Sequence, residues 1–258
     1  MKKLLWILSK FDHKSLIALG IMIFLDFDMI MAWKQYYNAH PGHLFRDPLS
    51  VGLWVYMTIL LCWNIDIRRD IARIIAGLIG GLVIESWGTF SEVWTYRSQE
   101  RPPLWIIPAW PVAALAIDRM NRAASYLLPK GDMKILWWIT MPAFILYMTH
   151  FSYHHGNHIA TILIFISMIV IISIPGEPRQ DMCLMLGGSL LGIFIEYYGT
   201  SRHVWTYYTH EIPPYVSIFA HGFASVAFQR AAAILDNRMP TWENIKNFIK
   251  SPKISKKI

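Results

Sequence analysis

Apolar residues fall into eight long runs separated by short polar stretches. Each run is close to the ~20 residues that a helix needs to cross ~30 Å of hydrocarbon, and no run shows a sustained alternation of apolar and polar positions. Helices satisfy their own backbone in lipid, so we predict an all-α, polytopic membrane bundle. The eight predicted spans are residues 15–33, 51–66, 71–88, 103–119, 133–150, 157–175, 182–199 and 214–234.

The chain also contains an internal repeat. Residues 70–119 align without a gap with residues 181–230, 111 positions later, and 19 of the 50 aligned positions are identical. A match at one fixed offset is the signature of duplicated structure. We therefore predict two four-helix repeats of parallel topology, residues 15–122 and 123–234. An interfacial segment, 1–14, precedes them, and a basic amphipathic tail, 235–258, follows.

The composition supports a membrane protein and argues against a nucleic-acid partner. Hydrophobic residues make up 55% of the 258 positions and charged residues 16%, below the ~25% of soluble domains. The net charge of +7 comes from loops on one side, which predicts that both termini are cytoplasmic. The predicted partners are the lipid bilayer and an apolar small molecule or lipid. No pattern specifies a cofactor, a metal or an oligomeric state.

Glu85 and Glu196 are the first candidates for chemistry, because they occupy the same place in the two repeats. An acidic group at membrane depth is costly and is usually paired or functional. A carboxylic acid in an apolar pocket is suited to protonating an alkene or to removing a proton beside a carbocation. The alternative is structural, with each glutamate bonding the Trp-x-Tyr loop of its own repeat.

Aromatic residues surround this motif. The Trp-x-Tyr pairs have strand-like spacing, which places both rings of a pair on one face. They form either an interfacial belt or a pocket wall that stabilises a cation. The candidate substrate-binding residues are Trp87, Trp94, Tyr96, Trp110, Tyr198, Trp205 and Tyr207.

The repeats differ where Trp110 aligns with His221. A buried histidine at this point is a candidate catalytic group or a packing residue. Asp26 and Asp28 of the first predicted span are auxiliary acids, one of which we expect near Glu85. Pro108 and Pro111 are expected to kink the fourth span.

Two further features have simpler interpretations. Arg119 and Arg230 close the fourth and eighth predicted spans, where we expect them to anchor the helices at the cytoplasmic surface. The histidines between the end of the fifth span and the start of the sixth could bind a metal through i and i+4 imidazoles, as in a membrane oxidoreductase. These histidines are His150, His154, His155 and His158.

The order of motifs in the third and fourth spans resembles the membrane family of carotenoid hydratases in carotenoid biosynthesis. The matching residues are Glu85, Gly88, Trp94, Tyr96, Pro103, Ile107, Pro108, Ala109 and Trp110. The Thr-Gly-x-Pro-Phe-Gly block of that family is absent between Gly88 and Trp94. The resemblance implies a polyisoprenoid substrate, addition of water to a carbon–carbon double bond, and Glu85 as the proton donor.

The sequence thus predicts a membrane enzyme that acts on a long apolar lipid or isoprenoid by acid–base chemistry, as a hydratase, isomerase or cyclase. Glu85 and Glu196 would be its acid and base. A transporter or lipid-binding protein without catalysis is the first alternative. A metal-dependent oxidoreductase at the histidine run is the second.

Overall fold

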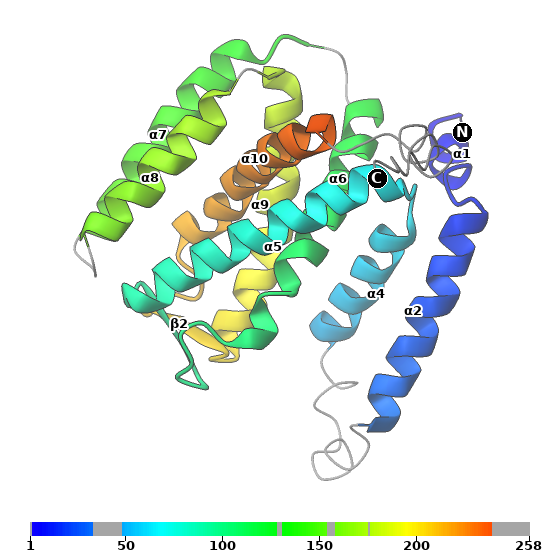
Figure 1. Cartoon of the computed structure of the whole chain (residues 1–258), viewed down its shortest axis with the longest axis horizontal. Helices are drawn as coiled ribbons and strands as arrows, with labels where there is room; N and C mark the ends of the chain where they lie inside the picture. Colours follow the sequence, from blue (N-terminus) through cyan, green and yellow to red (C-terminus); the bar gives the residue numbers. More distant parts are fainter. Residues whose placement is uncertain (1, 33–47, 128–130, 154–157, 175, 239–258) are drawn as a thin grey trace, which may run out of the picture.

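The computed structural model describes residues 2–32, 48–127, 131–153, 158–174 and 176–238. These residues are mostly helical, and each of the eight segments predicted as spans contains helix (Figure 1). The helices are α1 (Lys2–Leu8), α2 (His13–Ala32), α4 (Pro48–Cys62), α5 (Ile67–Phe90), α6 (Ala109–Leu127), α7 (Lys134–Tyr153), α8 (His158–Ser173), α9 (Pro178–Ser201) and α10 (Tyr215–Arg238). A 3₁₀ turn, η1 (Leu104–Ile106), precedes α6.

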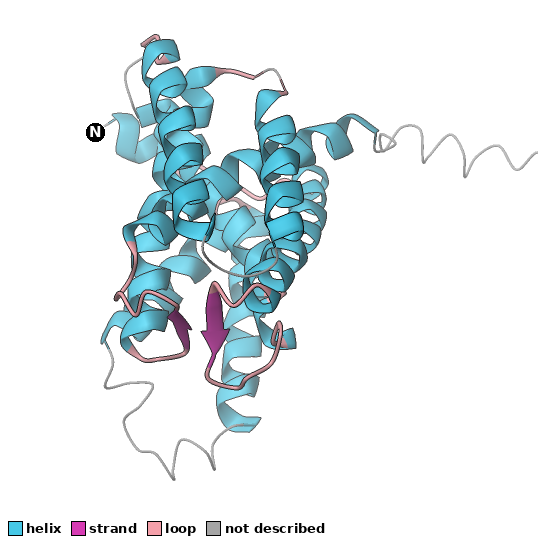
Figure 2. Cartoon of the chain, turned by 90° about the vertical axis from the view of Figure 1, so that its left-hand side faces the viewer, coloured by secondary structure: helices cyan, strands magenta, loops and turns pink. Residues whose placement is uncertain are grey.

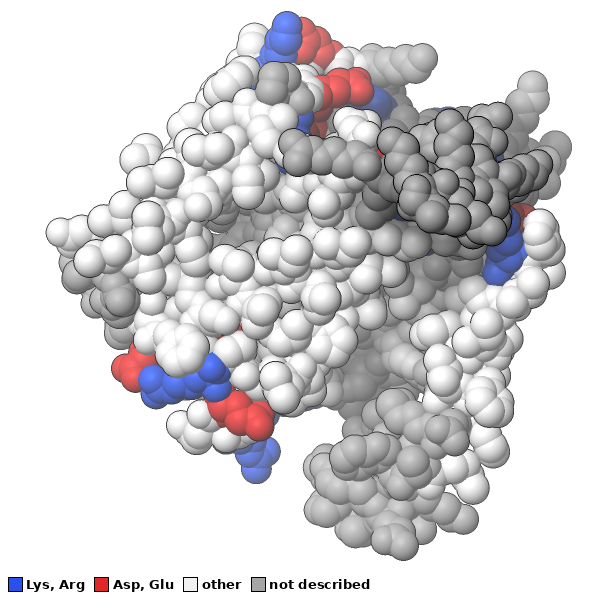
Figure 3. Space-filling model, in the orientation of Figure 1, with Lys and Arg blue, Asp and Glu red and all other residues white. Residues whose placement is uncertain are grey.

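Within the described residues, four helices are long and apolar enough to cross a membrane, namely α5, α7, α9 and α10. Their outward faces carry large apolar side chains, such as Ile79 and Leu82 on α5. In Figure 3 the charged side chains visible on this face lie toward its edges, and a broad uncharged surface separates them. An exposed apolar surface of this extent marks a contact with a membrane or another protein, and together with four helices of spanning length it indicates an integral membrane protein.

Helices α5, α6, α9 and α10 form the centre of the bundle, with α7 and α8 on one side and α2 and α4 on the other (Figure 1). Glycines bring the central helices close together. A Cβ on Gly77 of α5 would lie 3.0 Å from Pro111 Cα, and a Cβ on Gly188 of α9 would lie 2.9 Å from Gly222 Cα. These two contacts occupy aligned positions of the sequence repeat.

The aligned segments fold alike at one end and differ at the other. Helices α5 and α9 each have 24 residues and begin 111 positions apart. Helix α10 runs unbroken from Tyr215, whereas the aligned segment is divided between η1 and α6. Pro108 lies at this break and cannot donate a backbone hydrogen bond. The predicted kink is therefore an interruption, and Pro111 lies in the first turn of α6, where proline is tolerated.

Buried ion pairs join the helices at the end where α5 and α9 begin. Arg119 binds both carboxylate oxygens of Asp70 at 2.5 and 2.6 Å, and Arg230 binds Asp181. Both arginines are buried. The prediction that they anchor the helices at the surface is therefore wrong, because each is paired with an aspartate inside the protein.

The N-terminal segment packs on the same end of the bundle. Trp6 of α1 stacks on Tyr126 of α6 with ring centroids 3.8 Å apart, and Trp63 Nε1 donates a hydrogen bond to the carbonyl of Ile7 at 2.9 Å. These contacts fix α1 against α6 and the end of α4. The predicted basic tail lies outside the described residues from position 239 onward.

Candidate functional site

The site lies at the opposite end of the bundle, where two short strands meet. β1 (Trp94–Tyr96) follows α5 and β2 (Trp205–Tyr207) follows α9, and they pair antiparallel beneath the helix ends (Figure 2). Trp94 lies opposite Tyr207, and Tyr96 lies opposite Trp205. All four rings are buried. Of the two interpretations of the aromatic pairs, the structure favours the pocket wall over the interfacial belt.

Glu85 is 4% exposed and accepts hydrogen bonds on both oxygens. Oε2 accepts from the Tyr96 hydroxyl at 2.8 Å and from Trp94 Nε1 at 3.2 Å, and Oε1 accepts from Trp110 Nε1 at 3.0 Å. Both indole partners can only donate. The carboxylate is thus held as an acceptor, and it fixes the loop of its own repeat.

Glu196 has the same partners from its own repeat and a different third one. Trp205 Nε1 donates to Oε2 at 3.1 Å, and the Tyr207 hydroxyl lies 3.0 and 3.1 Å from the two oxygens. The third contact is from His221 Nε2 to Oε1, at 2.8 Å. Where Glu85 meets an indole, Glu196 meets an imidazole, which can donate or accept a proton.

Burial keeps the phenols of both pairs in their donating form. It raises the pKa of Tyr96 and of Tyr207, and the neighbouring Glu85 and Glu196 raise each pKa further. Both hydroxyls therefore stay protonated at neutral pH and donate to the glutamates.

The Glu-x-x-Gly spacing explains how the sequence builds this arrangement. A Cβ on Gly88 would lie 1.9 Å from the Trp94 ring, and a Cβ on Gly199 would lie 2.0 Å from the Trp205 ring. Each indole therefore lies directly on a glycine and reaches the glutamate one turn earlier on the same helix face. After α5, the turn also uses a positive φ of 56° at Glu92.

The two glutamates line one cavity of about 120 Å³. Trp110 of α6 and His221 of α10 stack within it, with ring centroids 5.6 Å apart and planes inclined by 17°. Apart from the glutamates, His221, the tyrosines and Ser217, the wall is apolar and consists of aliphatic side chains, tryptophans, Met148 and Phe151. The predicted site residues in this wall are Glu85, Glu196, His221, Trp87, Trp94, Tyr96, Trp110, Trp205 and Tyr207.

Three predicted site residues are not among the described side chains that line this wall. Tyr198 lies on another face of α9, where the Arg202 guanidinium is 4.6 Å from its ring centroid. Asp26 and Asp28 belong to α2, which packs against α4, and their side chains lie outside the described part of the chain. The expected approach of one of them to Glu85 stays a prediction.

The wall also contains residues that the sequence did not single out. Met148 and Phe151 of α7 and Val216 and Ser217 of α10 complete it. Met148, Phe151 and Val216 look like ordinary core residues in the sequence, so no local signal could identify them.

The buried ion pairs at the other end of the bundle did leave a signal in the sequence. Asp70 and Arg119 of the first repeat recur as Asp181 and Arg230 in the second, and this recurrence could have revealed the pairs.

The histidine run is divided between helices. His150 lies in the last turn of α7 and His158 begins α8. His154 and His155 lie outside the described residues, as does the side chain of His158. Among the described residues, no group of three His, Cys, Asp or Glu side chains is placed to hold a metal.

No protein-family model, curated protein or solved structure matches this chain.

Proposed function

We propose that this protein is an integral membrane enzyme that transfers protons to and from an apolar isoprenoid or lipid substrate, in a hydration, isomerisation or cyclisation. The observation that carries the proposal is the 2.8 Å contact between His221 and Glu196 in a cavity of mainly apolar wall. General acid–base catalysis by such a pair typically contributes about 10²–10⁴-fold in rate.

The asymmetry of the repeat assigns the roles. Trp110 holds Glu85 without being able to titrate, whereas the His221–Glu196 pair can release and recover a proton. We therefore place the acid at His221–Glu196 and assign Glu85 to holding the loop and to electrostatic stabilisation. This differs from the role that the resemblance to carotenoid hydratases gives Glu85.

The proposed reaction begins when the proton shared by His221 Nε2 and Glu196 Oε1 forms a C–H bond at one alkene carbon. The electron pair for this bond comes from the alkene, so the second carbon becomes cationic. Tryptophan faces attract a cation, and the carboxylates add a negative field. Loss of a proton from a neighbouring carbon to the pair gives an isomerised or cyclised alkene, while attack of water and loss of its proton give an alcohol.

The size of the cavity restricts how a substrate binds. A cavity of about 150 Å³ holds a benzene-sized molecule, and this one measures about 120 Å³. Only one short segment of a long chain would fit between the glutamates. The remainder would extend beyond the cavity, which suits an amphiphile or polyisoprenoid supplied from the bilayer.

The proposed topology is eight transmembrane helices in two parallel four-helix repeats, with both termini in the cytoplasm. It is supported by helices in all eight apolar segments and by the matching lengths of α5 and α9. Reporter fusions after Arg122 and after residue 258 test it, since both should report the cytoplasmic side. A fusion after Arg97 should report the opposite side.

The test of the activity compares the wild type with His221→Gln and His221→Trp. The tryptophan variant copies the first repeat, and Gly192 aligns with Gly81, against which Trp110 packs. Mass spectrometry identifies the apolar molecules that co-purify in mild detergent and those that accumulate in the expressing cells. A product that disappears in both folded variants while its precursor is retained supports the enzyme.

Binding or transport without catalysis is the second candidate function. It is favoured by the complete hydrogen bonding of Glu85, which is what a structural carboxylate requires. The same molecule bound to the wild type and to both His221 variants would support this candidate and contradict the enzyme.

A further inference from the structure

A second cavity lies at the other end of the bundle, where α5 and α9 begin. Arg69 precedes Glu85 on α5 by about 24 Å at ~1.5 Å per residue, so the two cavities are distinct. The second cavity has a volume of about 420 Å³, with Trp6 on one side. Its charged lining consists of four cations and one carboxylate, namely Lys10, Arg69, Arg122, Arg179 and Glu177.

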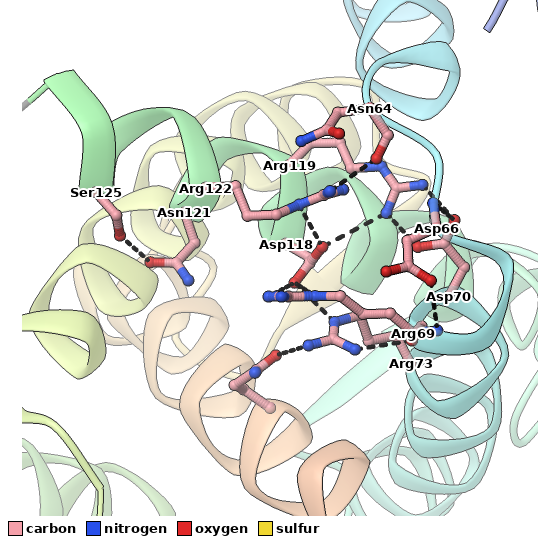
Figure 4. Close-up of polar contacts among 11 residues, drawn as sticks. Asn64, Asp66, Arg69, Asp70, Arg73, Asp118, Arg119, Asn121, Arg122 and Ser125 are labelled. Carbon is pink, nitrogen blue, oxygen red and sulfur yellow. Dashed lines mark hydrogen bonds and ion pairs between the residues drawn. The ribbon is translucent and has the colours of Figure 1, made fainter. Parts of the chain in front are cut away.

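One buried aspartate, Asp118, holds Arg69 and Arg122 of this lining and the neighbouring Arg73 in place. Asp118, 2% exposed, lies 2.8 Å from Arg69 Nη2, 2.7 Å from Arg73 Nε and 3.0 Å from Arg122 Nε (Figure 4). Asp118 is also 3.5 Å from Arg119 Nη1, and Arg119 pairs with Asp70, so two carboxylates face four guanidinium groups. The cluster keeps a positive excess, and its geometry is fixed before any ligand arrives.

Arg122 shows this preorganisation most clearly. Its Nη1 donates to the carbonyl of Asn64 at 2.7 Å, and its guanidinium lies 5.8 Å from the Trp63 ring. Its Nη2 is buried and has no hydrogen-bond partner within the described residues. A donor that is fixed and unused beside a cavity is suited to an anionic acceptor.

The second repeat lacks this cluster, although it folds in the same way. The residues aligned with Arg69, Arg73, Asp118 and Arg122 are Gln180, Leu184, Gln229 and Ala233. The second repeat keeps only the Asp181–Arg230 pair, which corresponds to Asp70–Arg119. That single pair suffices to join two such helices, so the additional charges of the first repeat exceed what the fold requires.

We propose that this cavity binds the phosphate or diphosphate group of an anionic ligand. Guanidinium forks match phosphate oxygens in bidentate geometry, and the four cations of the lining exceed the two carboxylates beside them, Glu177 in the lining and Asp118 next to Arg69 and Arg122. The phosphate belongs either to a lipid headgroup or to a soluble molecule. The proposal is independent of the acid–base function proposed for the glutamate cavity.

The test measures binding to the purified full chain in mild detergent by calorimetry. The probes are inorganic pyrophosphate for a soluble source and dioctanoyl phosphatidic acid for a lipid source, and dioctanoyl phosphatidylcholine, a zwitterion without net charge, serves as the control. Binding of pyrophosphate, of phosphatidic acid or of both supports the site and identifies its source. Binding of neither at about 1 mM, the weak end of specific affinity, overturns the proposal, as does equal binding of phosphatidylcholine.

Variants locate the binding. Arg122→Gln and Lys10→Gln each remove one cation, and we expect the dissociation constant to rise about tenfold or more, as for the loss of one charge-assisted contact. Arg68→Gln is the matched control, because Arg68 lies on the same end, pairs with Asp236 and is not in the cavity lining. The Lys10 ammonium lies 5.5 Å from the Trp6 ring centroid and donates no hydrogen bond to the cluster within the described residues. Its variant therefore keeps the test decisive if Arg122→Gln does not fold. Equal weakening by Arg68→Gln would overturn the assignment to this cavity.

Discussion

Trp110 and His221 stack face to face, with ring centroids 5.6 Å apart, although they occupy the same position in two repeats 111 residues apart. Each contacts the glutamate of its own repeat, at 3.0 Å for Trp110 and 2.8 Å for His221. The two repeats thus give their glutamates the same Trp and Tyr partners but a different third partner, an indole for Glu85 and an imidazole for Glu196. The difference separates a carboxylate that only accepts hydrogen bonds from one that can exchange a proton.

The first prediction is that Glu85→Gln destabilises the protein more than Glu196→Gln. Whichever way the new amide of Glu85→Gln is oriented, its NH₂ faces an indole N–H, so one buried donor loses its partner. Such a loss costs about 1–3 kcal/mol. In Glu196→Gln the NH₂ can face His221, whose imidazole can present an acceptor nitrogen. Thermal unfolding in detergent measures the difference.

The matched pair of variants also separates structure from chemistry. Glu196→Gln should unfold close to the temperature of the wild type and still abolish the proposed conversion of the apolar substrate into its product. Equal destabilisation by the two variants would show that His221 does not adapt as argued here.

The second prediction concerns the glycines beneath the indoles. Gly88→Ala and Gly199→Ala each place a Cβ about 2 Å from a tryptophan ring, so the indole must move away from its glutamate. Overpacking of this kind costs about 1–3 kcal/mol. Gly20→Ala and Gly52→Ala are the controls, since nothing lies within 4 Å of their Cβ positions. These controls should stabilise their helices, by up to about 1 kcal/mol. Unchanged unfolding of Gly88→Ala would contradict the packing.

The sequence identified much of this site because the repeat marks it twice. The spacing of Glu85, Gly88, Trp94 and Tyr96 depends on local geometry, namely one helical turn followed by a tight turn and a short strand. Local geometry of this kind leaves a readable pattern. The pairing of β1 with β2 is a long-range contact, and nothing in either Trp-Thr-Tyr segment specifies its partner strand.

Two expectations drawn from the sequence differ from the structure because they depend on contacts that the local sequence does not specify. Arg119 and Arg230 were expected at the surface because arginine at a helix end commonly anchors there. The structure buries them because Asp70 and Asp181 lie on the facing helices at matching depth. Tyr198 aligns with Trp87, which lines the cavity, so the repeat predicts the same place for both, but the Tyr198 ring instead lies 4.6 Å from the Arg202 guanidinium.

The third prediction concerns the buried ion pairs. Asp181→Asn leaves Arg230 buried without its counter-charge, which costs about 3–5 kcal/mol. Asp70→Asn leaves Arg119 with Asp118 alone, at 3.5 Å, and Asp118 already faces Arg69, Arg73 and Arg122. We expect Asp70→Asn to be the more damaging variant because Arg119 is 1% exposed and Arg230 is 8% exposed. Chemical unfolding followed by tryptophan fluorescence measures both.

A surface pair provides the control for this comparison. Glu92 and Arg101 lie 3.0 Å apart with both side chains exposed, and such pairs contribute about 0–1 kcal/mol. Glu92→Gln should therefore unfold like the wild type. A loss in Glu92→Gln as large as that in Asp70→Asn would show that burial does not set the cost.

The fourth prediction tests the strand pairing on which the shared cavity depends. Thr95 lies opposite Thr206, and paired residues of antiparallel strands have Cα atoms about 4.5–5.5 Å apart, within the ~4.4–6.8 Å that a disulfide spans. In a Cys62→Ala, Cys183→Ala background, Thr95→Cys with Thr206→Cys should cross-link under mild oxidation. Peptide mass spectrometry after digestion measures the yield. Thr95→Cys with Thr209→Cys is out of register and should cross-link far less. Equal yields would mean that β1 and β2 are not paired in this register. The glutamates of the two repeats would then not share one cavity.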